Sequence, residues 1–357
     1  MFPYLILIST PVIYLFLKIL TRKQNSCIGL IVSGLYLWSF VAFRGLPVGT
    51  DTMTYSGLFY SISHMSGNLG LISNSLHIEY GYVLLNKIIS LFTDNYLFVQ
   101  LIVSFVTIFL LINIILKSSS DYLMSLEIFI SLTYYFLLMN ISRQFLAVSI
   151  LSLSLLMIIR EKRILGLIFI ILAGLIHQSA FLFLAVWILS KFKLTKNRFY
   201  CLVGGTVILG VPLINVLNRL MVNNERYNIG ILNGSSSGSG KGLFGVIYAL
   251  IIFIFLIIYY LIYDFENDNS FSRNLMYILL IITFLNIANI KYPFLGRIRY
   301  VFEPFLILII PEIIKKLKLS EYRLVIYILI EILGFIAIYK LIPNNPFYGV
   351  VPYSFWR

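Results

Sequence analysis

Residues 95–116 read NYLFVQLIVSFVTIFLLINIIL, an apolar stretch of 22 residues that contains no charged side chain. A helix needs about 20 apolar residues to cross the hydrocarbon core of a bilayer, so this stretch predicts a transmembrane helix. Similar runs precede and follow it along nearly the whole chain. They predict about twelve spans, near residues 3–20, 27–43, 95–116, 121–139, 143–160, 163–176, 178–191, 198–218, 243–263, 273–290, 299–316 and 322–341.

The composition points to the same class of protein. Of the 357 residues, 60% are hydrophobic and only 11% are charged, and almost no polar stretch is long enough to form a soluble domain. We therefore expect an all-α polytopic membrane protein that forms a single integral membrane domain over residues 1–357. Cys27 and Cys201 lie in apolar surroundings without a second ligand nearby, which predicts neither a disulfide nor a metal site.

The net charge of +13 would indicate a nucleic-acid partner in a soluble protein. Here the basic residues lie in short loops beside apolar spans, where they set the orientation of the chain and contact anionic lipid head groups. This distribution excludes nucleic acid as the partner and favours membrane lipid.

The loop charges also predict which side of the membrane each loop faces. Six short loops, the first of them at Arg22–Lys23, hold 15 basic residues, whereas the alternate loops hold 11 over longer segments. Basic residues concentrate on the cytoplasmic side, so both termini are expected outside. Four arginines and one histidine lie at the outer ends of spans against this rule: Arg44, Arg143, His177, Arg297 and Arg299. An anionic substrate at the membrane is the simplest reason for them.

Two outer segments are long enough to have structure of their own. Segment 44–94 contains the stretches 53–62 and 79–89, which have apolar and aromatic residues at helical spacing but are too short to span. They predict helices that lie in the membrane interface. Segment 219–242 ends in a stretch rich in glycine and serine, which predicts a flexible extracytoplasmic loop.

Two acidic residues, Glu127 and Glu331, lie inside predicted spans. Ionisable residues within membranes often belong to proton pathways, but neither glutamate has an acidic or basic partner at helical spacing. Proton coupling and structural hydrogen bonding in the bundle interior both remain open interpretations.

The first motif with chemical content is Arg44-Gly-Leu-Pro-Val-Gly-Thr-Asp-Thr-Met-Thr-Tyr55, directly after the second span. The Arg44 guanidinium can donate two hydrogen bonds to phosphate oxygens, and Pro47 and Gly49 predict a turn. This turn displays Asp51 at the membrane face, within reach of a sugar hydroxyl. The alternative is that Arg44 extends toward the interface and Asp51 or Thr50 caps the following helix.

The second motif, Asn140-Ile-Ser-Arg-Gln-Phe-Leu-Ala147, opens the fifth span from its outer side. It places Arg143 in the first turn of a helix, where a cation opposes the helix dipole and lies beside unpaired amide donors. A phosphate ligand is favoured over a purely topological arginine.

The third motif, Ala173-Gly-Leu-Ile-His-Gln-Ser-Ala180, lies between two predicted spans of only about 13 residues each, too short for an ideal crossing. This predicts a broken hairpin whose bend lies below the outer surface. His177 at the bend is a candidate general base, proton relay or phosphate ligand, and the alternative is a hydrogen-bonded structural residue. His64 and His77 lack the close ligand spacing of a zinc site.

The fourth motif, Lys291-Tyr-Pro-Phe-Leu-Gly-Arg-Ile-Arg-Tyr-Val-Phe-Glu-Pro304, leads into the eleventh span. Arg297 and Arg299, with Glu303 just inside the span, predict a polar cluster at the membrane surface. Interfacial anchoring by Tyr292 and Tyr300 is the alternative, and it explains the aromatic residues better than the two arginines.

The order of these motifs resembles the EpsG-type family of polysaccharide polymerases, which is related to the Wzy O-antigen polymerases. The similarity runs through nearly the whole chain. The residues that carry it are Arg44 with Val48-Gly-Thr-Asp-Thr52 and Tyr55, Glu79-Tyr-Gly-Tyr82, Ser142-Arg-Gln144 with Ala147, Gly174-Leu-Ile-His-Gln-Ser-Ala180, Arg299-Tyr300 and Pro352-Tyr353.

The resemblance implies a glycosyltransferase of the bacterial cytoplasmic (inner) membrane with a GT-C-like helix bundle and an active site that faces the exterior. The growing O-antigen, capsule or exopolysaccharide chain would pass from undecaprenyl pyrophosphate to a newly flipped, lipid-linked repeat unit. The reaction implies no cofactor and no metal, and a chain-length regulator is a possible protein partner.

The residues suggest roles in such a reaction. Arg143, Arg297 and Arg299 are expected to hold the pyrophosphate, and Arg44 the second lipid-linked substrate. Either Asp51 or His177 is expected to deprotonate the acceptor hydroxyl. Further candidates for substrate binding are Gln144, Glu79, Tyr55, Tyr300 and Glu303.

Two other functions fit parts of the pattern. A flippase or transporter of lipid-linked oligosaccharide would also need many spans and basic residues, but it should show repeated halves with paired broken helices, and the sequence has no convincing internal repeat. A ligase that transfers the finished glycan to another acceptor would need the same pyrophosphate site.

Overall fold

The computed structural model describes residues 2–22, 25–206, 208, 212, 243–292, 295–319, 321–342 and 349–356. Within these ranges the chain is almost entirely helical, and its β-type pairing is an isolated bridge between Arg44 and Phe355. The prediction of an all-α fold is confirmed. The predicted loop 219–242 and the second half of the predicted span 198–218 lie largely outside the described residues.

Among the described residues, five helices are long and apolar enough to cross a membrane. They are α1 (Phe2–Thr21), α6 (Tyr96–Ser118), α9 (Ser142–Ile159), α14 (Leu243–Leu261) and α15 (Ser270–Lys291). A sixth is added if α7 (Tyr122–Ser131) and α8 (Tyr134–Asn140), which are bent by 56° relative to each other, count as one span. The protein is thus a multi-pass membrane protein, but the described residues give five or six spans where about twelve were predicted.

Short and interrupted helices account for much of this difference. The predicted spans 27–43 and 163–176 form α2 (Cys27–Ala42) and α10 (Arg163–Ile176), of 16 and 14 residues. A 14-residue helix is about 21 Å long, less than the ~30 Å of a hydrocarbon core. Hydropathy detects such helices as apolar but does not measure where they end.

Two predicted spans are broken. The predicted span 178–191 is a 3-10 helix, η1 (Gln178–Phe183), followed by the six-residue α11 (Leu184–Leu189). In place of one helix over 299–316, the chain forms α16 (Leu295–Arg299), η2 (Glu303–Phe305) and α17 (Leu306–Lys316). Pro304 is at the start of η2, and its lack of an N–H group removes a hydrogen bond that one continuous helix would make at this point.

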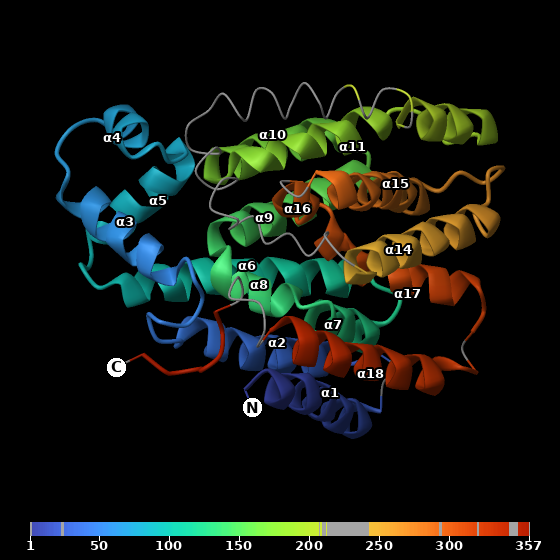
Figure 1. Ribbon diagram of the computed structural model, residues 1–357, viewed down its shortest axis with the longest axis horizontal. Helices are drawn as coiled ribbons and strands as arrows, with labels where there is room; N and C mark the ends of the chain where they lie inside the picture. The colour runs from blue at the N-terminus through green and yellow to red at the C-terminus, as the bar shows by residue number, and fades with distance from the viewer. Residues whose placement is uncertain are drawn as a thin grey trace. The chain divides into compact units, whose positions relative to one another are not determined.

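The chain divides into two compact units, one of residues 1–184 and 310–357 and one of residues 185–309. In the first unit, α1 packs on α2, α2 on α6, α6 on α9 and α9 on α10 (Figure 1). Side chains from these helices and from α7 and α8 form most of its buried apolar interior.

Three short helices of the first unit form a separate group, coloured blue in Figure 1: α3 (Thr52–His64), α4 (Leu69–Leu76) and α5 (Tyr80–Ser90). The two helices predicted in segment 44–94 correspond to α3 and α5, and α4 lies between them in the sequence. Lys87 of α5 donates to three carbonyls at the end of α3, each at 3.1 Å, from Ile62, Ser63 and Met65. The ammonium group thereby satisfies carbonyls that have no partner within α3.

The bend between α7 and α8 has a local cause. Thr133 adopts a left-handed conformation with φ 64°, which ends the regular helix after Ser131. Asp121 caps the start of α7 by accepting from the Met124 N–H at 3.1 Å. The last helix, α18 (Arg323–Leu341), packs beside α7 in the same unit.

In the second unit, α14 and α15 are consecutive helices that pack against each other. The turn between them is closed by Asp268, which accepts a hydrogen bond from the Tyr263 hydroxyl and forms an ion pair with Arg273 at 2.5 Å. Both α16 and η2 pack against α15, which positions the fourth motif.

Candidate functional site

The segment after α2 is covered by the last residues of the chain, 349–356, which we call the C-terminal strap. The N–H of Gly45 donates to the Ser354 carbonyl at 2.7 Å, and the N–H of Trp356 donates to the Phe43 carbonyl at 2.8 Å. The backbone of the strap is therefore hydrogen-bonded to the backbone at the beginning of the Arg44 motif. This pairing explains why the C-terminal Pro352-Tyr353 belongs to the set of motif residues, although it is distant in sequence.

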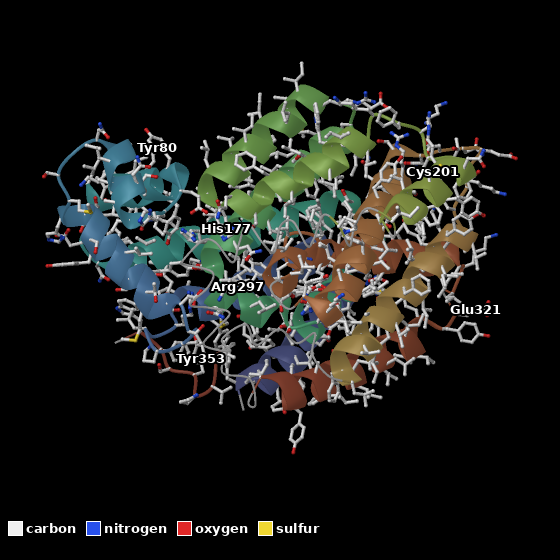
Figure 2. The ribbon with its side chains drawn as sticks, turned by 45° about the horizontal axis from the view of Figure 1, so that its top comes forward. Tyr80, His177, Cys201, Arg297, Glu321 and Tyr353 are labelled. Carbon is white, nitrogen blue, oxygen red and sulfur yellow. The ribbon has the colours of Figure 1, made fainter. Side chains whose placement is uncertain are left out.

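Tyr353 fastens the strap to the helices (Figure 2). Its hydroxyl donates to the Phe40 carbonyl at 2.7 Å, and its ring stacks on Phe2 with centroids 3.9 Å apart. Residues near both ends of the chain, Phe2 and Tyr353, thus lie together.

The Arg44 side chain is buried among helices of the first unit, with 1% of its surface exposed. Its Nη1 donates to the Val41 carbonyl at 2.5 Å, whereas its Nε has no hydrogen-bond partner among the described residues. A cavity of about 10 Å³ beside it is lined by Tyr82, Tyr96 and Gln100 and has room for about one water molecule. In this arrangement Arg44 organises the loop, and direct contact with a substrate head group requires the groups that bury it to move.

Asn140, at the end of α8, ties the Arg44 motif to the Arg143 motif. Its Oδ1 accepts from the Asp51 N–H at 3.1 Å and from the Thr50 hydroxyl. Asp51 precedes the first residue of α3, but its carboxylate makes no capping hydrogen bond to that helix. Helix capping therefore does not account for this carboxylate.

Gly49 makes the close approach of these two segments possible. It has φ 88°, a conformation that residues with a Cβ rarely adopt, and a Cβ at this position would overlap the Met139 carbonyl. We expect Gly49→Ala to displace the loop that holds Asp51 and to lower the activity of the protein at least tenfold, which corresponds to a rise of roughly 1.4 kcal/mol or more in the activation free energy. Gly57→Ala is the matched control, because no atom lies within 4 Å of a Cβ at residue 57. The measurement is the activity of each variant per amount of protein inserted in the membrane, and equal activities of the two variants would contradict this role.

Arg143 lies in the first turn of α9 and contacts Glu79, a pairing that the sequence did not predict. Arg143 Nη1 lies 2.8 Å from Glu79 Oε2, and the two side chains are 17% and 18% exposed. The guanidinium also lies over the Tyr82 ring at 5.6 Å. Arg143 Nε and Nη1 are buried and have no aligned hydrogen-bond acceptor among the described residues, so the contact with Glu79 is an ion pair and the guanidinium is not fully satisfied by the protein.

Glu79 also contacts the third motif. Its Oε1 accepts from the Gln178 N–H at 3.1 Å, so one carboxylate joins Arg143 to the turn that contains His177. The approach depends on Gly81, because a Cβ there would lie 2.7 Å from the Leu175 carbonyl oxygen. The structure therefore brings together three motifs that are separated by long stretches of sequence.

His177 lies at the end of α10 (Figure 2), where its backbone is extended and its side chain caps η1. Its Nδ1 accepts from the Ser179 N–H at 3.4 Å and lies 2.8 Å from the Ser179 hydroxyl. In this tautomer the proton of the neutral imidazole is on Nε2. His177 is thus set to donate a hydrogen bond from Nε2, and a general-base role would require the other tautomer.

Two of the lower-ranked candidates are buried. Tyr55 has 7% exposure and packs edge-to-face on Tyr82 with centroids 6.1 Å apart. Gln144 follows Arg143 in the first turn of α9 and is 4% exposed. Tyr55 thus supports the cluster of Glu79, Arg143 and His177 through the Tyr82 ring that lies beside Arg143.

The second unit holds the fourth motif. Arg299 is buried, at 6% exposure, and lies 3.6 Å from Glu303 Oε1. Asn286 of α15 joins the pair: its Oδ1 accepts from Arg299 at 3.0 Å and its Nδ2 donates to Glu303 at 2.8 Å. Arg299 also donates to the Tyr300 hydroxyl at 3.2 Å. Arg299, Glu303, Tyr300 and Asn286 thus form one hydrogen-bonded network.

Arg297 differs from Arg299 although they lie two residues apart on α16. Its side chain is exposed, whereas that of Arg299 is buried. The exposed guanidinium can reach a ligand without breaking the network around Glu303.

Sequence reasoning missed Asn140 and Asn286 as organising residues. Each is a polar residue at or inside an apolar helix and both are buried, at 0% and 3% exposure. An unexplained asparagine in an apolar helix was the available signal, because burial in a membrane protein requires a hydrogen-bond partner. The described residues contain no group of three side chains that could hold a metal ion.

The comparisons with known proteins agree with this set of motifs. The family model named EpsG family matches residues 27–355, which includes all four motifs and most of the strap. Searches of curated proteins and of solved structures returned no match. Because the family model covers nearly the whole chain and every cluster described above, this protein is a member of the EpsG family.

Proposed function

We propose that this protein polymerises lipid-linked polysaccharide repeat units at the outer face of a bacterial cytoplasmic membrane. The glycan carried on undecaprenyl pyrophosphate is transferred to the next lipid-linked repeat unit, and the product is an O-antigen, capsule or exopolysaccharide. Membership of the EpsG family supports a membrane glycosyltransferase, and the spans that the described residues contain support the membrane location.

The observation that carries the proposal is the environment of Arg143. This cation lies in the first turn of α9, where Ile141 provides no side-chain cap, and its Nε and Nη1 lack aligned acceptors among the described residues. The helix dipole and amide donors at this end of α9 favour an anion. A pyrophosphate oxygen satisfies both the guanidinium and the helix terminus.

The reaction needs a base for the acceptor and donors for the leaving group. The acceptor hydroxyl attacks the anomeric carbon of the donor glycan, the bond from that carbon to the pyrophosphate oxygen breaks, and undecaprenyl pyrophosphate leaves with the electron pair. We assign Asp51 as the group that takes the acceptor proton, because its carboxylate does not cap α3. His177 donates from Nε2 to a phosphate oxygen.

The remaining assignments follow the same reasoning within each unit. In the first unit, Arg143 binds pyrophosphate and Arg44 acts on the second lipid-linked substrate once the groups that bury it have moved. In the second unit, the exposed Arg297 is the phosphate ligand, and Arg299 is held by Glu303 and Asn286 in a position that supports it. We further propose about twelve crossings in a GT-C-like bundle, and a chain-length regulator as a partner.

The test is the length distribution of surface polysaccharide on a gel, from a deletion strain and from the same strain complemented with the wild-type gene. A ladder that collapses to single repeat units in the deletion strain, and returns on complementation, is expected for a polymerase. Loss of even the single-unit product would indicate a flippase, and long polymer retained on its lipid carrier would indicate a ligase.

A further inference from the structure

Helices α7 and α18 run in the same direction and are in contact over most of α7. At the start, Asp121 lies 3.4 Å from Arg323 and accepts from the Tyr327 hydroxyl at 2.6 Å. At the other end, a Cβ on Gly334 would lie 2.5 Å from the Ser131 hydroxyl oxygen. These two contacts set the register of the helices in the region between them.

This register places Glu127 of α7 against Glu331 of α18, so that the two carboxyl groups contact each other. Glu127 is 1% exposed. Among the described residues, neither oxygen of Glu127 nor Oε1 of Glu331 has a hydrogen-bond donor. The sequence interpretation of two isolated glutamates was incomplete, because the partner of each comes from another helix.

Two ionised carboxylates in contact in an apolar interior are strongly unfavourable, since each loses its hydration and repels the other. Binding of one proton relieves both the repulsion and the loss of hydration, because a protonated carboxyl donates a hydrogen bond to the ionised one. The unpartnered oxygens therefore indicate that a hydrogen-bond donor is missing. A carboxyl group that keeps its proton supplies this donor to the other carboxylate.

The neighbouring helices offer no other partner for this pair within the described residues. Helices α1, α6 and α8 pack against α7, and α1 also packs against α18. Of the charged and titratable groups on these elements, Glu331 alone interacts with the Glu127 carboxyl. The others are Tyr4, Tyr14, Lys18, Tyr96, Lys117, Asp121, Tyr122, Tyr134, Tyr135, Arg323, Tyr327 and Tyr339.

We propose that Glu127 and Glu331 form a proton-binding site that fastens α18 to α7. This goes beyond the polymerase reaction, which uses neither residue. Helix α7 continues through the bend at Thr133 into α8, whose Asn140 holds the Asp51 loop. Loss of the proton therefore loosens α18 and acts on that loop through α7 and α8.

The test is the unfolding temperature of the purified full-length protein in detergent micelles as a function of pH. The folded protein holds the proton at a pH where exposed glutamates are ionised, so folding takes up a proton. Stability from this pair is fully present at low pH. It falls by about tenfold in the unfolding equilibrium constant for each pH unit between the pH at which the unfolded chain releases the proton and the higher pH at which the folded protein releases it. Wild-type protein is expected to lose stability between about pH 5 and pH 9.

In Glu127→Gln and Glu331→Gln, the amide group replaces the protonated carboxyl as a permanent donor. Each variant is expected to lose this pH dependence and to exceed wild type in stability at high pH. Glu321→Gln is the control, because Glu321 is exposed and should keep the wild-type profile (Figure 2). Identical pH profiles for wild type and both pair variants would overturn the proposal.

A second measurement does not depend on the stability of the variants. Infrared difference spectra of wild-type protein across the pH range should show the carbonyl band of a protonated carboxylic acid disappear as the pH rises. The band should be missing from either pair variant that can be purified. Absence of the band from wild-type protein at neutral pH would overturn the proposal.

Discussion

Replacing Arg143 by alanine is expected to collapse surface polysaccharide from long chains to single repeat units, while the protein still inserts into the membrane. The Arg143 side chain is 17% exposed and its partner Glu79 is 18% exposed, so removal of the guanidinium leaves no deeply buried charge. Loss of a donor that stabilises developing negative charge typically lowers a rate by roughly 100- to 1,000-fold. Arg143→Lys should recover little activity if two N–H groups bind phosphate together. The readout is the gel ladder in the complemented deletion strain, normalised to protein in the membrane.

A double variant separates phosphate binding from support of Glu79. If Arg143 only neutralises Glu79, removing both side chains should restore polymer relative to Arg143→Ala alone. We expect no restoration from Arg143→Ala with Glu79→Ala. Arg160→Ala is the control for charge, since Arg160 is exposed at the opposite end of α9. Long polymer from Arg143→Ala at wild-type levels would refute the phosphate role.

Replacing Arg299 by alanine is expected to act first on stability. It leaves the Glu303 carboxylate buried with Asn286 and without its cation. Removing one partner of a buried ion pair commonly costs about 3–5 kcal/mol, a large share of the stability of a domain. The amount of folded protein should therefore fall sharply, as measured by size-exclusion profiles and unfolding temperature in detergent.

The neighbouring arginine provides a matched comparison. Arg297→Ala removes an exposed cation from the same short helix and should leave stability unchanged while it lowers polymer formation. Combining Arg299→Met with Glu303→Gln should recover much of the folded protein, because no charge is then left buried without a partner. Equal stability of Arg299→Ala and Arg297→Ala would show that the Glu303 pair does not stabilise the fold.

The membrane class, the helical fold and the positions of the motifs were all readable in the sequence. Hydropathy locates apolar helices because each residue contributes to it locally. Gly49 predicts a turn from the sequence alone, and its φ in the structure is 88°. The number of spans was less predictable. Whether α10 crosses a membrane or ends after 14 residues depends on what it packs against.

The sequence by itself determined that this is a polytopic helical protein with Arg44, Arg143, His177 and Arg299 at the ends of apolar helices. Only the tertiary structure decided what each of these residues touches. It buried the Arg44 side chain among helices, paired Arg143 with Glu79, and placed Arg299 in a buried network while Arg297 stayed exposed. It also brought Glu127 to Glu331. The physical reason is that helix periodicity assigns a residue to a face, but its partner depends on how that helix is rotated and placed against others far away in the chain.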